Sequence, residues 1–169
     1  RNGKWVAASG HGHDHPSEVY PLRPRDRHPS RLTDNNPWIK ERKLGRQEAV
    51  SHKARDDLEL QGVLIHPLPG TSKAPHPLIV MVHGGPEWHF ENGWITWYAY
   101  PGQVAAARGF AVFYPNYRGS TGRGVAFTKM GQGDPAGKEF DDIVDAVDHL
   151  VEKGIADRSR VGITGGSYG

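Results

Sequence analysis

The pattern of apolar and polar residues changes near residue 47. Before that point, short apolar stretches such as 4–9 (KWVAAS) and 17–22 (SEVYPL) are separated by Gly, Pro, His and Asp. This spacing is typical of short antiparallel strands joined by turns. We therefore expect residues 1–46 to form strands and loops.

After residue 47 the apolar runs become longer. Runs 49–54 and 58–65 flank the polar pair Asp56-Asp57 and predict a β-hairpin. Residues 77–82 (PLIVMV) are continuously apolar, which is typical of a strand buried on both faces. The second part of the chain therefore begins with a hairpin and a central strand.

Strand and helix signals then alternate. Residues 102–109 (GQVAAARG) are prone to form a helix, and 110–115 (FAVFYP) predict a second buried strand that Pro115 stops. Residues 160–164 (RVGIT) predict a third, short buried strand. Alternating strands and helices indicate an α/β fold with a mostly parallel sheet and flanking helices.

The clearest helix signal lies in residues 134–154, where apolar residues recur at helical spacing. These residues are Phe140, Ile143, Val144, Val147, Leu150 and Val151. Asp134 is expected to cap the start of the helix, with Pro135 in the first turn, and Gly154 is expected to end it.

Composition narrows the function classes. The 169 residues are 36% hydrophobic and 24% charged, which is ordinary for one globular domain. A net charge of +2 argues against a dedicated nucleic-acid partner, and no run approaches the roughly 20 apolar residues of a membrane span. The absence of cysteine excludes a disulfide framework. Because Arg1 and Gly169 look like cut ends, we interpret the chain as an internal fragment. Its cellular location stays open, with the cytoplasm favoured.

Two polar clusters are weak candidates for binding sites. Four arginines in residues 23–31 are broken up by prolines and Asp26, so a solvated turn is expected. Residues 11–15 (HGHDH) resemble a metal cluster, but Gly12 and Pro16 favour a loop and no supporting partner is evident. We predict no metal and no cofactor.

Ser167 stands in a G-x-S-x-G motif, with Gly165 and Gly169 two residues to either side. This spacing marks a sharp strand-to-helix turn on which a nucleophilic serine is exposed, because side chains at the flanking positions would collide. With 22 glycines among 169 residues, the motif arises by chance in about one such sequence in ten. Its position directly after a predicted strand strengthens it.

A second motif, His83-Gly84-Gly85, follows the strand predicted at 77–82. A Gly-Gly pair at the end of a strand exposes backbone N–H groups, which together with the N–H of Tyr168 can bind the oxyanion of a tetrahedral intermediate. A plain Gly-Gly turn is the alternative. We expect His83 to orient the turn through its own hydrogen bonds rather than to act as the catalytic base.

Four motifs in this order resemble the catalytic domain of the prolyl oligopeptidase family of serine peptidases, in its acylaminoacyl-peptidase and dipeptidyl-peptidase-like branch. They are VHGGP, FYPNYRGSTGRG, GKEFDDIVDAVDHLVEKGIAD and GGSYG, and the resemblance covers roughly residues 47–169. It implies the N-terminal portion of an α/β-hydrolase domain that reaches as far as the nucleophile elbow. Residues 1–46 resemble, more loosely, the last blade of a β-propeller.

The resemblance implies roles for individual residues. Ser167 would be the nucleophile, and the N–H groups of Gly85 and Tyr168 would form the oxyanion hole. Arg118 is expected to form a structural ion pair. Since the triad order in this fold is Ser, Asp or Glu, then His, the acid and the base are expected beyond Gly169, and residues 1–169 alone are expected to be inactive.

The favoured function is hydrolysis of short peptides through an acyl-enzyme. A carboxylesterase of the same fold is one alternative, because the same motifs serve esters. A catalytically dead homologue whose propeller binds a partner is another. Substrate preference, exo- or endopeptidase action and oligomeric state stay open.

Overall fold

The computed structural model describes residues 4–169, which divide into two compact units. The first comprises the chain up to Lys43 together with Asn92–Ile95, and the second comprises Leu44–Glu91 and Thr96–Gly169. The division lies close to the predicted boundary at residue 47. That the first unit is the end of a propeller stays a prediction.

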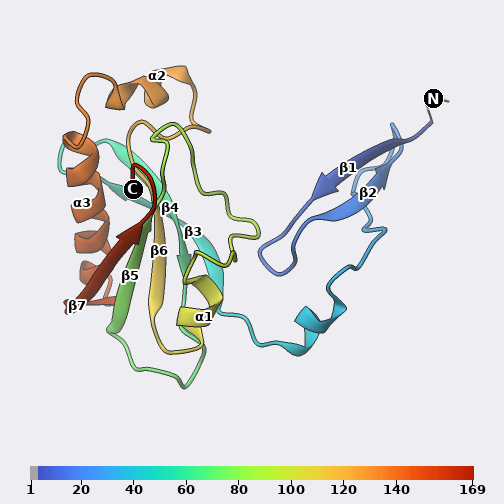
Figure 1. Cartoon of the computed structure of the whole chain (residues 1–169), viewed down its shortest axis with the longest axis horizontal. Helices are drawn as coiled ribbons and strands as arrows, with labels where there is room; N and C mark the ends of the chain where they lie inside the picture. Colours follow the sequence, from blue (N-terminus) through green and yellow to red (C-terminus); the bar gives the residue numbers. More distant parts are fainter. Residues whose placement is uncertain (1–3) are drawn as a thin grey trace. The chain divides into compact units, whose positions relative to one another are not determined.

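In the first unit, β1 (Val6–Gly10) and β2 (Glu18–Leu22) pair in antiparallel fashion, which confirms the two predicted strands (Figure 1). A 3-10 helix follows at Pro37–Glu41. The carboxylate of Glu18 is buried and accepts a hydrogen bond from the backbone N–H of Asn35 at 2.9 Å. This bond holds the segment after β2 against the strand.

The two polar clusters of this unit have local partners. Arg23 lies over the Trp5 ring, 4.1 Å from its centroid. His11 Nδ1 accepts a hydrogen bond from the Trp94 backbone at 2.7 Å, and the hydroxyl of Tyr20 lies 3.3 Å from His15 Nε2. Within residues 4–169, no three His, Cys, Asp or Glu side chains are arranged to hold a metal ion.

The second unit is built on a five-stranded sheet in the order β3-β4-β6-β5-β7 (Figure 1). The strands are β3 (Gln47–Lys53), β4 (Glu59–Ile65), β5 (His76–Val82), β6 (Ala111–Asn116) and β7 (Ala156–Gly165). β4 runs antiparallel to both β3 and β6, whereas β5 runs parallel to β6 and β7. The α/β class is confirmed, but the sheet is mixed rather than mostly parallel. The short turn between β3 and β4 allows only an antiparallel pair. β4 is also antiparallel to its other neighbour, β6, so half of the sheet is antiparallel.

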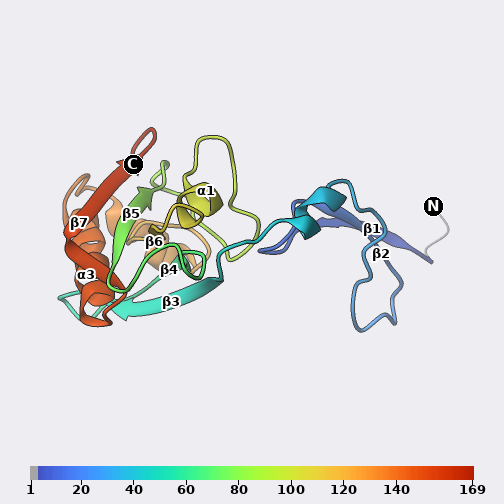
Figure 2. The same ribbon diagram turned by 90° about the horizontal axis from the view of Figure 1, so that it is seen from below.

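Three α-helices belong to this unit. They are α1 (Gly102–Ala106), α2 (Val125–Thr128), which continues into a 3-10 turn at Lys129–Gly131, and α3 (Lys138–Glu152). α3 packs against β7 and β3. Figures 1 and 2 show it beside β7. In the described part of the chain, no helix is long and apolar enough to cross a membrane.

The ends of α3 agree only partly with the sequence prediction. Asp134 is not the N-cap residue, which is Gly137, although its Oδ2 accepts a hydrogen bond from the backbone N–H of Lys138, the first residue of the helix, at 3.1 Å. Pro135 precedes the helix instead of lying in its first turn. Gly154 follows the last turn with φ of +69°, a left-handed conformation that favours glycine, and ends the helix as predicted.

The predicted apolar stripe of α3 is confirmed in part: Leu150 is buried and Ile143, Val147 and Val151 pack against the core, but the other two members face solvent. Phe140 is 62% exposed and Val144 is also exposed. The buried positions are Glu139, Asp142, Ala146 and Leu150. The inward face is therefore apolar toward the end of the helix and acidic at its start.

The main core lies between the sheet and α3. Leu64, Val80 and Phe113 from three adjacent strands pack with Leu150 of the helix, and all four are essentially inaccessible to solvent. Pro115 does not stop β6 as predicted, because it pairs opposite Gly62 of β4 and removes only its own N–H donor.

Residues 160–164 form part of strand β7, as predicted, but the strand is not buried within the described residues. Val161 and Ile163 are both exposed, the latter by 64%. In the described residues β7 pairs only with β5, so its other edge is open. An edge strand keeps one row of backbone groups and much of its side-chain surface in solvent.

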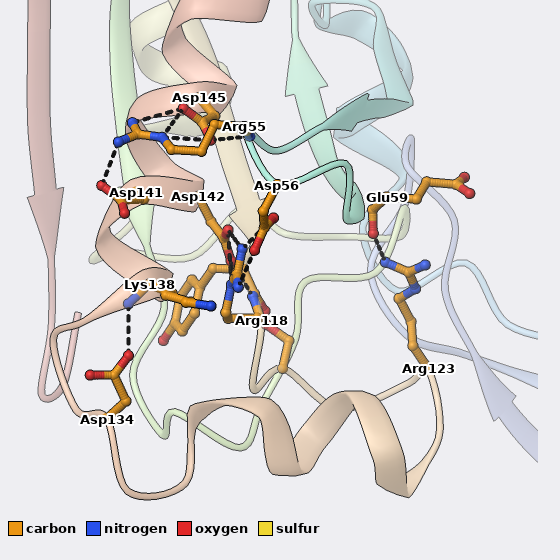
Figure 3. A network of polar contacts seen from close by, with 12 residues as sticks. Arg55, Asp56, Glu59, Arg118, Arg123, Asp134, Lys138, Asp141, Asp142 and Asp145 are labelled. Atoms are coloured by element: carbon orange, nitrogen blue, oxygen red, sulfur yellow. Dashed lines mark hydrogen bonds and ion pairs between the residues drawn. The ribbon is translucent and has the colours of Figure 1, made fainter.

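A buried ion-pair network ties α3 to two loops (Figure 3). Arg118, which follows β6, is 6% exposed; its guanidinium contacts Asp142 of α3 at 2.6 Å and Asp56 of the β3–β4 turn at 2.9 Å. Its backbone N–H also donates to Asp142 at 2.8 Å. Hydrogen bonds to Asp142 and Asp56 raise the pKa of Arg118 above its usual range. This geometry agrees with the structural ion-pair role expected for Arg118.

A second arginine adds to the same attachment. Arg55 of the β3–β4 turn donates through its Nε to Asp145 at 3.0 Å and through a terminal nitrogen to Asp141 at 2.8 Å (Figure 3). Together the two arginines link the β3–β4 turn to three acidic residues of α3, namely Asp141, Asp142 and Asp145.

Removing the Asp142 carboxylate should destabilise the fold strongly. We expect Asp142→Ala to lower the free energy of unfolding by about 3–5 kcal/mol, because the Arg118 guanidinium is left buried without its main partner. Asp148→Ala is the matched control, since Asp148 lies on the same helix but pairs with Arg158 at the surface and should matter by less than about 1 kcal/mol. Urea denaturation of the intact protein containing this sequence measures both, and equal effects would contradict the prediction.

A buried histidine makes the free energy of unfolding depend on pH. His52 of β3 is 6% exposed, neither ring nitrogen has a hydrogen-bond partner among the described residues, and its ring centroid lies 5.6 Å from that of His149 on α3. Burial, and secondarily the charge of His149, lowers the pKa of His52 to about 4, against the opposing effect of Asp145.

The fold should therefore lose stability in acid through His52. Because the unfolded histidine binds a proton near its ordinary pKa of about 6.5 while the folded one does not, stability falls as the pH drops from about 6.5 to about 4. His52→Leu should flatten this slope, whereas His13→Leu, at an exposed position, should keep it. Melting temperatures measured between pH 7 and pH 4 test this, and an unchanged slope in His52→Leu would contradict it.

Candidate active site

The turn after β7 holds Ser167 in an unusual backbone conformation. β7 ends at Gly165, and a hydrogen bond of 3.1 Å from the Gly169 N–H to the Gly166 carbonyl closes the turn. Ser167 has φ of +60°, in the left-handed region that non-glycine residues seldom adopt. Such a conformation costs about 1–3 kcal/mol and persists only when its surroundings impose it.

Gly165 and Gly169 make the left-handed conformation of Ser167 possible, because they let the turn lie close against the backbone at the end of β5. A Cβ atom at Gly165 would lie 2.4 Å from the carbonyl carbon of Gly169 and 2.9 Å from the Val82 carbonyl oxygen. A Cβ at Gly169 would lie 2.4 Å from the same Val82 oxygen. Both motif positions therefore pack against the end of β5 with no space for a side chain.

The Gly-Gly turn after β5 lies directly beside the serine. A Cβ on Gly84 would be 3.0 Å from Ser167 Cβ and 3.5 Å from Ser167 Oγ. Gly85 has φ of +128°, which is accessible to glycine but strained for other residues. The structure thus brings together Gly84 and Ser167, which are far apart in the sequence but follow neighbouring parallel strands.

His83 is buried, and both of its ring nitrogens are occupied. Nδ1 lies 2.8 Å from the Gly84 carbonyl oxygen, which can only accept, so Nδ1 donates. Nε2 lies 2.9 Å from Ser120 Oγ. The ring stacks on Tyr117 at 4.4 Å between centroids, and the Tyr117 hydroxyl donates to the His83 carbonyl at 2.8 Å. Burial lowers the pKa of His83, which favours the neutral ring.

These contacts agree with an orienting role for His83. Its side chain is bonded to the carbonyl of the next residue, and its carbonyl is bonded to Tyr117, so the entry to the Gly-Gly turn is held on both sides. His89, the next histidine along, has its Nδ1 2.8 Å from Thr121 Oγ1. That the acid and base of a triad lie beyond residue 169 stays a prediction.

Tyr168 is attached through its side chain to the start of α3. Its hydroxyl donates to Glu139 Oε1 at 2.5 Å, and the Ala136 backbone N–H reaches both groups, at 2.6 Å from Glu139 Oε1 and 3.0 Å from the tyrosine oxygen. Hydrogen bonding to Glu139 raises the pKa of Tyr168.

Glu139 was missed by the sequence analysis. An acidic residue in the first turn of a helix normally faces solvent and favours the helix dipole, so it gives no sign of a site. The one available signal is its helical phase, since Glu139 stands eleven residues, or about three turns, before the buried Leu150.

Comparisons with known proteins relate this chain to peptidases. Residues 97–169 match the prolyl oligopeptidase family. The chain is 36% identical over 158 residues to Uncharacterized peptidase YuxL of Bacillus subtilis, covering 92% of this chain and 23% of that protein. It is 39% identical over 148 residues to Dipeptidyl aminopeptidase BIII of Pseudoxanthomonas mexicana, covering 83% of this chain and 21% of that protein.

A solved structure agrees with these relatives. The acylaminoacyl peptidase of Pyrococcus horikoshii superposes with a TM-score of 0.83 at 30% sequence identity, covering 98% of this chain and 26% of that one. The chain therefore spans about a quarter of the length of the proteins it matches. The predicted family resemblance is confirmed.

Gly165 and Gly169 should tolerate no side chain. We expect Gly165→Ala to destabilise the fold by about 1–3 kcal/mol, because the new methyl group must displace the backbone of Gly169 or Val82. Gly162→Ala on the same strand is the matched control, since a Cβ there meets no atom within 4 Å and should be neutral or slightly stabilising. Thermal unfolding of both variants measures the difference, and equal melting temperatures would contradict the steric argument.

Proposed function

Because residues 97–169 place this chain in the prolyl oligopeptidase family, we propose that the protein containing it is a serine peptidase that hydrolyses short peptides, with Ser167 as its nucleophile. The observation that carries the proposal is the left-handed Ser167 at the tip of a tight turn, packed against Gly84 of the Gly-Gly turn. The relatives named above are peptidases, which supports amide hydrolysis as the reaction.

In the proposed mechanism, Ser167 Oγ attacks the carbonyl carbon of the peptide bond, and its proton passes to a general base. The carbonyl π bond opens, and the resulting oxyanion accepts hydrogen bonds from the backbone N–H groups of Gly85 and Tyr168. Collapse of this intermediate breaks the C–N bond, and the departing amine takes the proton from the base. Water then attacks the acyl-enzyme in the same way and releases the acid and free Ser167.

The close approach of the two turns suits this chemistry. An oxyanion hole needs two donors on the same side of the nucleophile, at a position that does not shift during the reaction. Gly84 packs on Ser167, so the next residue, Gly85, is held near the serine from the β5 side, while Tyr168 follows the serine directly. We assign Gly165 and Gly169 to the elbow, and His83 and Gly84 to support of the Gly-Gly turn.

We further propose that residues 47–169 are the N-terminal portion of an α/β-hydrolase domain and that residues 1–46 are the end of a β-propeller. Superposition on the acylaminoacyl peptidase over 98% of this chain supports both assignments. The two compact units found here are compatible with a division of this kind. The general base and its acidic partner are proposed to follow residue 169.

The test is labelling with a fluorophosphonate, which reacts with activated serines, on the intact protein containing this sequence. We expect the label on Ser167, and we expect Ser167→Ala to abolish labelling and lower kcat for a peptide substrate by at least about 10⁴-fold. Ser159→Ala, at an exposed serine of the same strand, should behave as wild type.

The outcomes separate the alternatives. Turnover of simple esters without turnover of peptide amides would replace the peptidase by a carboxylesterase. A folded protein that takes no label would favour a catalytically dead homologue. Label on another serine would overturn the assignment of Ser167.

A further inference from the structure

The acidic group at the start of α3 is placed where it can control the elbow. Glu139 is 5% exposed, and its Oε1 accepts hydrogen bonds from both the Tyr168 hydroxyl and the Ala136 backbone. Its other oxygen, Oε2, is buried and has no partner among the described residues. Burying a carboxylate is costly, so this arrangement needs a compensating interaction.

Two features reduce that cost. Glu139 is the second residue of α3, a helix of 15 residues whose N-terminal end favours negative charge. Ala136, just before the helix, adopts φ of +58°, and its N–H points to both Glu139 and Tyr168. The backbone thus adopts an uncommon conformation at Ala136, where its N–H joins the hydrogen-bonded pair of Glu139 and Tyr168.

The Tyr168 ring borders a cavity in the described part of the protein. This cavity has a volume of about 420 Å³ and is lined by Tyr117, Phe140, Ile143 and Gly165 among others. Tyr168 as a whole is 39% exposed. The bonds from its hydroxyl to α3 are therefore the main directional contacts that hold this side chain in the described part of the protein.

Holding the Tyr168 side chain also holds its backbone. The peptide N–H proposed for the oxyanion hole is attached to the same Cα as the tethered side chain, and the preceding residue is the strained Ser167. Without the tether, rotation about the Tyr168 backbone could relax that strain and turn the N–H away. A misplacement of about 1 Å in an active site can cost about 10²-fold in rate, so a displaced donor stabilises the oxyanion less.

We propose that Glu139 is a positioning residue that acts through Tyr168: it accepts the tyrosine hydroxyl and so keeps the Tyr168 N–H directed at the oxyanion. This proposal rests on the proposed function. Glu139 itself does not touch the substrate. The expected effect is on kcat, because a displaced donor reduces the stabilisation of the transition state more than that of the bound substrate.

The experiment compares four variants of the intact protein with a peptide substrate. Tyr168→Phe removes the hydroxyl, Glu139→Leu removes the acceptor, the double variant removes both, and Glu139→Gln retains an acceptor oxygen. We expect Tyr168→Phe and Glu139→Leu each to lower kcat by about 10- to 100-fold with KM changed by less than about threefold. The double variant should be no worse than either single variant, because both break the same contact.

Glu139→Gln and one further variant, Glu152→Leu, separate positioning from general stability. Glu139→Gln should recover kcat to within about fivefold of wild type, because its amide oxygen can accept from the Tyr168 hydroxyl and the Ala136 N–H. Glu152→Leu, an exposed glutamate at the other end of α3, should leave kcat unchanged. If Glu139→Leu does not fold, Tyr168→Phe decides the question alone, since it removes one atom from a partly exposed residue.

The proposal and the proposed function fail in different ways. Unchanged kcat in Tyr168→Phe, or multiplicative losses in the double variant, would overturn the positioning role while Ser167→Ala still abolished activity. Activity that survives Ser167→Ala would overturn the proposed function itself. A loss that appears in KM rather than kcat would also overturn the positioning role.

Discussion

The second unit depends on one close contact between backbones, that of the end of β5 with the turn after β7. The Val82 carbonyl oxygen lies so near Gly165 and Gly169 that a side chain at either position would overlap it. This contact requires β5 and β7 to be neighbours and parallel, as they are. It also compresses four residues into a turn closed by one hydrogen bond, and the serine at its tip takes up the left-handed conformation. The conformation of Ser167 is thus a consequence of sheet packing more than of its own preference.

α3 supports this arrangement with charges where a helix of this kind usually places apolar side chains. Asp142 holds Arg118 and, through it, the β3–β4 turn, while Glu139 holds the residue after the serine. Buried charges are expensive, and well-packed apolar residues would often stabilise a fold as much. What charges provide is direction, because a hydrogen bond specifies an angle and an apolar contact does not. The acidic start of α3 therefore fits a need for fixed geometry around the elbow, and the apolar end supplies the core.

Much of this could be predicted from the sequence because its determinants are local. The strands, the hairpin and α3 follow from periodicity over a few residues, and the tight turn at Ser167 follows from the glycines two positions to either side. The errors concern partners distant in the sequence. The pairing of β4 with β6 makes the sheet mixed, and the edge of β7 that is open in the described residues exposes Ile163. Distant partners also hold Glu139 and Asp142 inward, beside the apolar residues of α3. Apart from the helical phase of Glu139, no local pattern contains this information.

Strand order, which no local pattern reveals, also explains why the candidate site lies at the carboxyl ends of β5 and β7. Carboxyl ends of adjacent parallel strands meet at one edge, so the turns after β5 and β7 are brought together without any further device. On the other side of the sheet β4 runs antiparallel to β6, and its carboxyl end lies at the opposite edge. Only the parallel half can therefore combine a Gly-Gly turn with a serine elbow. Sequence motifs identify the two turns separately, but the strand order brings them together in one candidate site. Once that order is known, the buried contact of Glu139 with Tyr168 can be recognised as part of the surroundings of the same site.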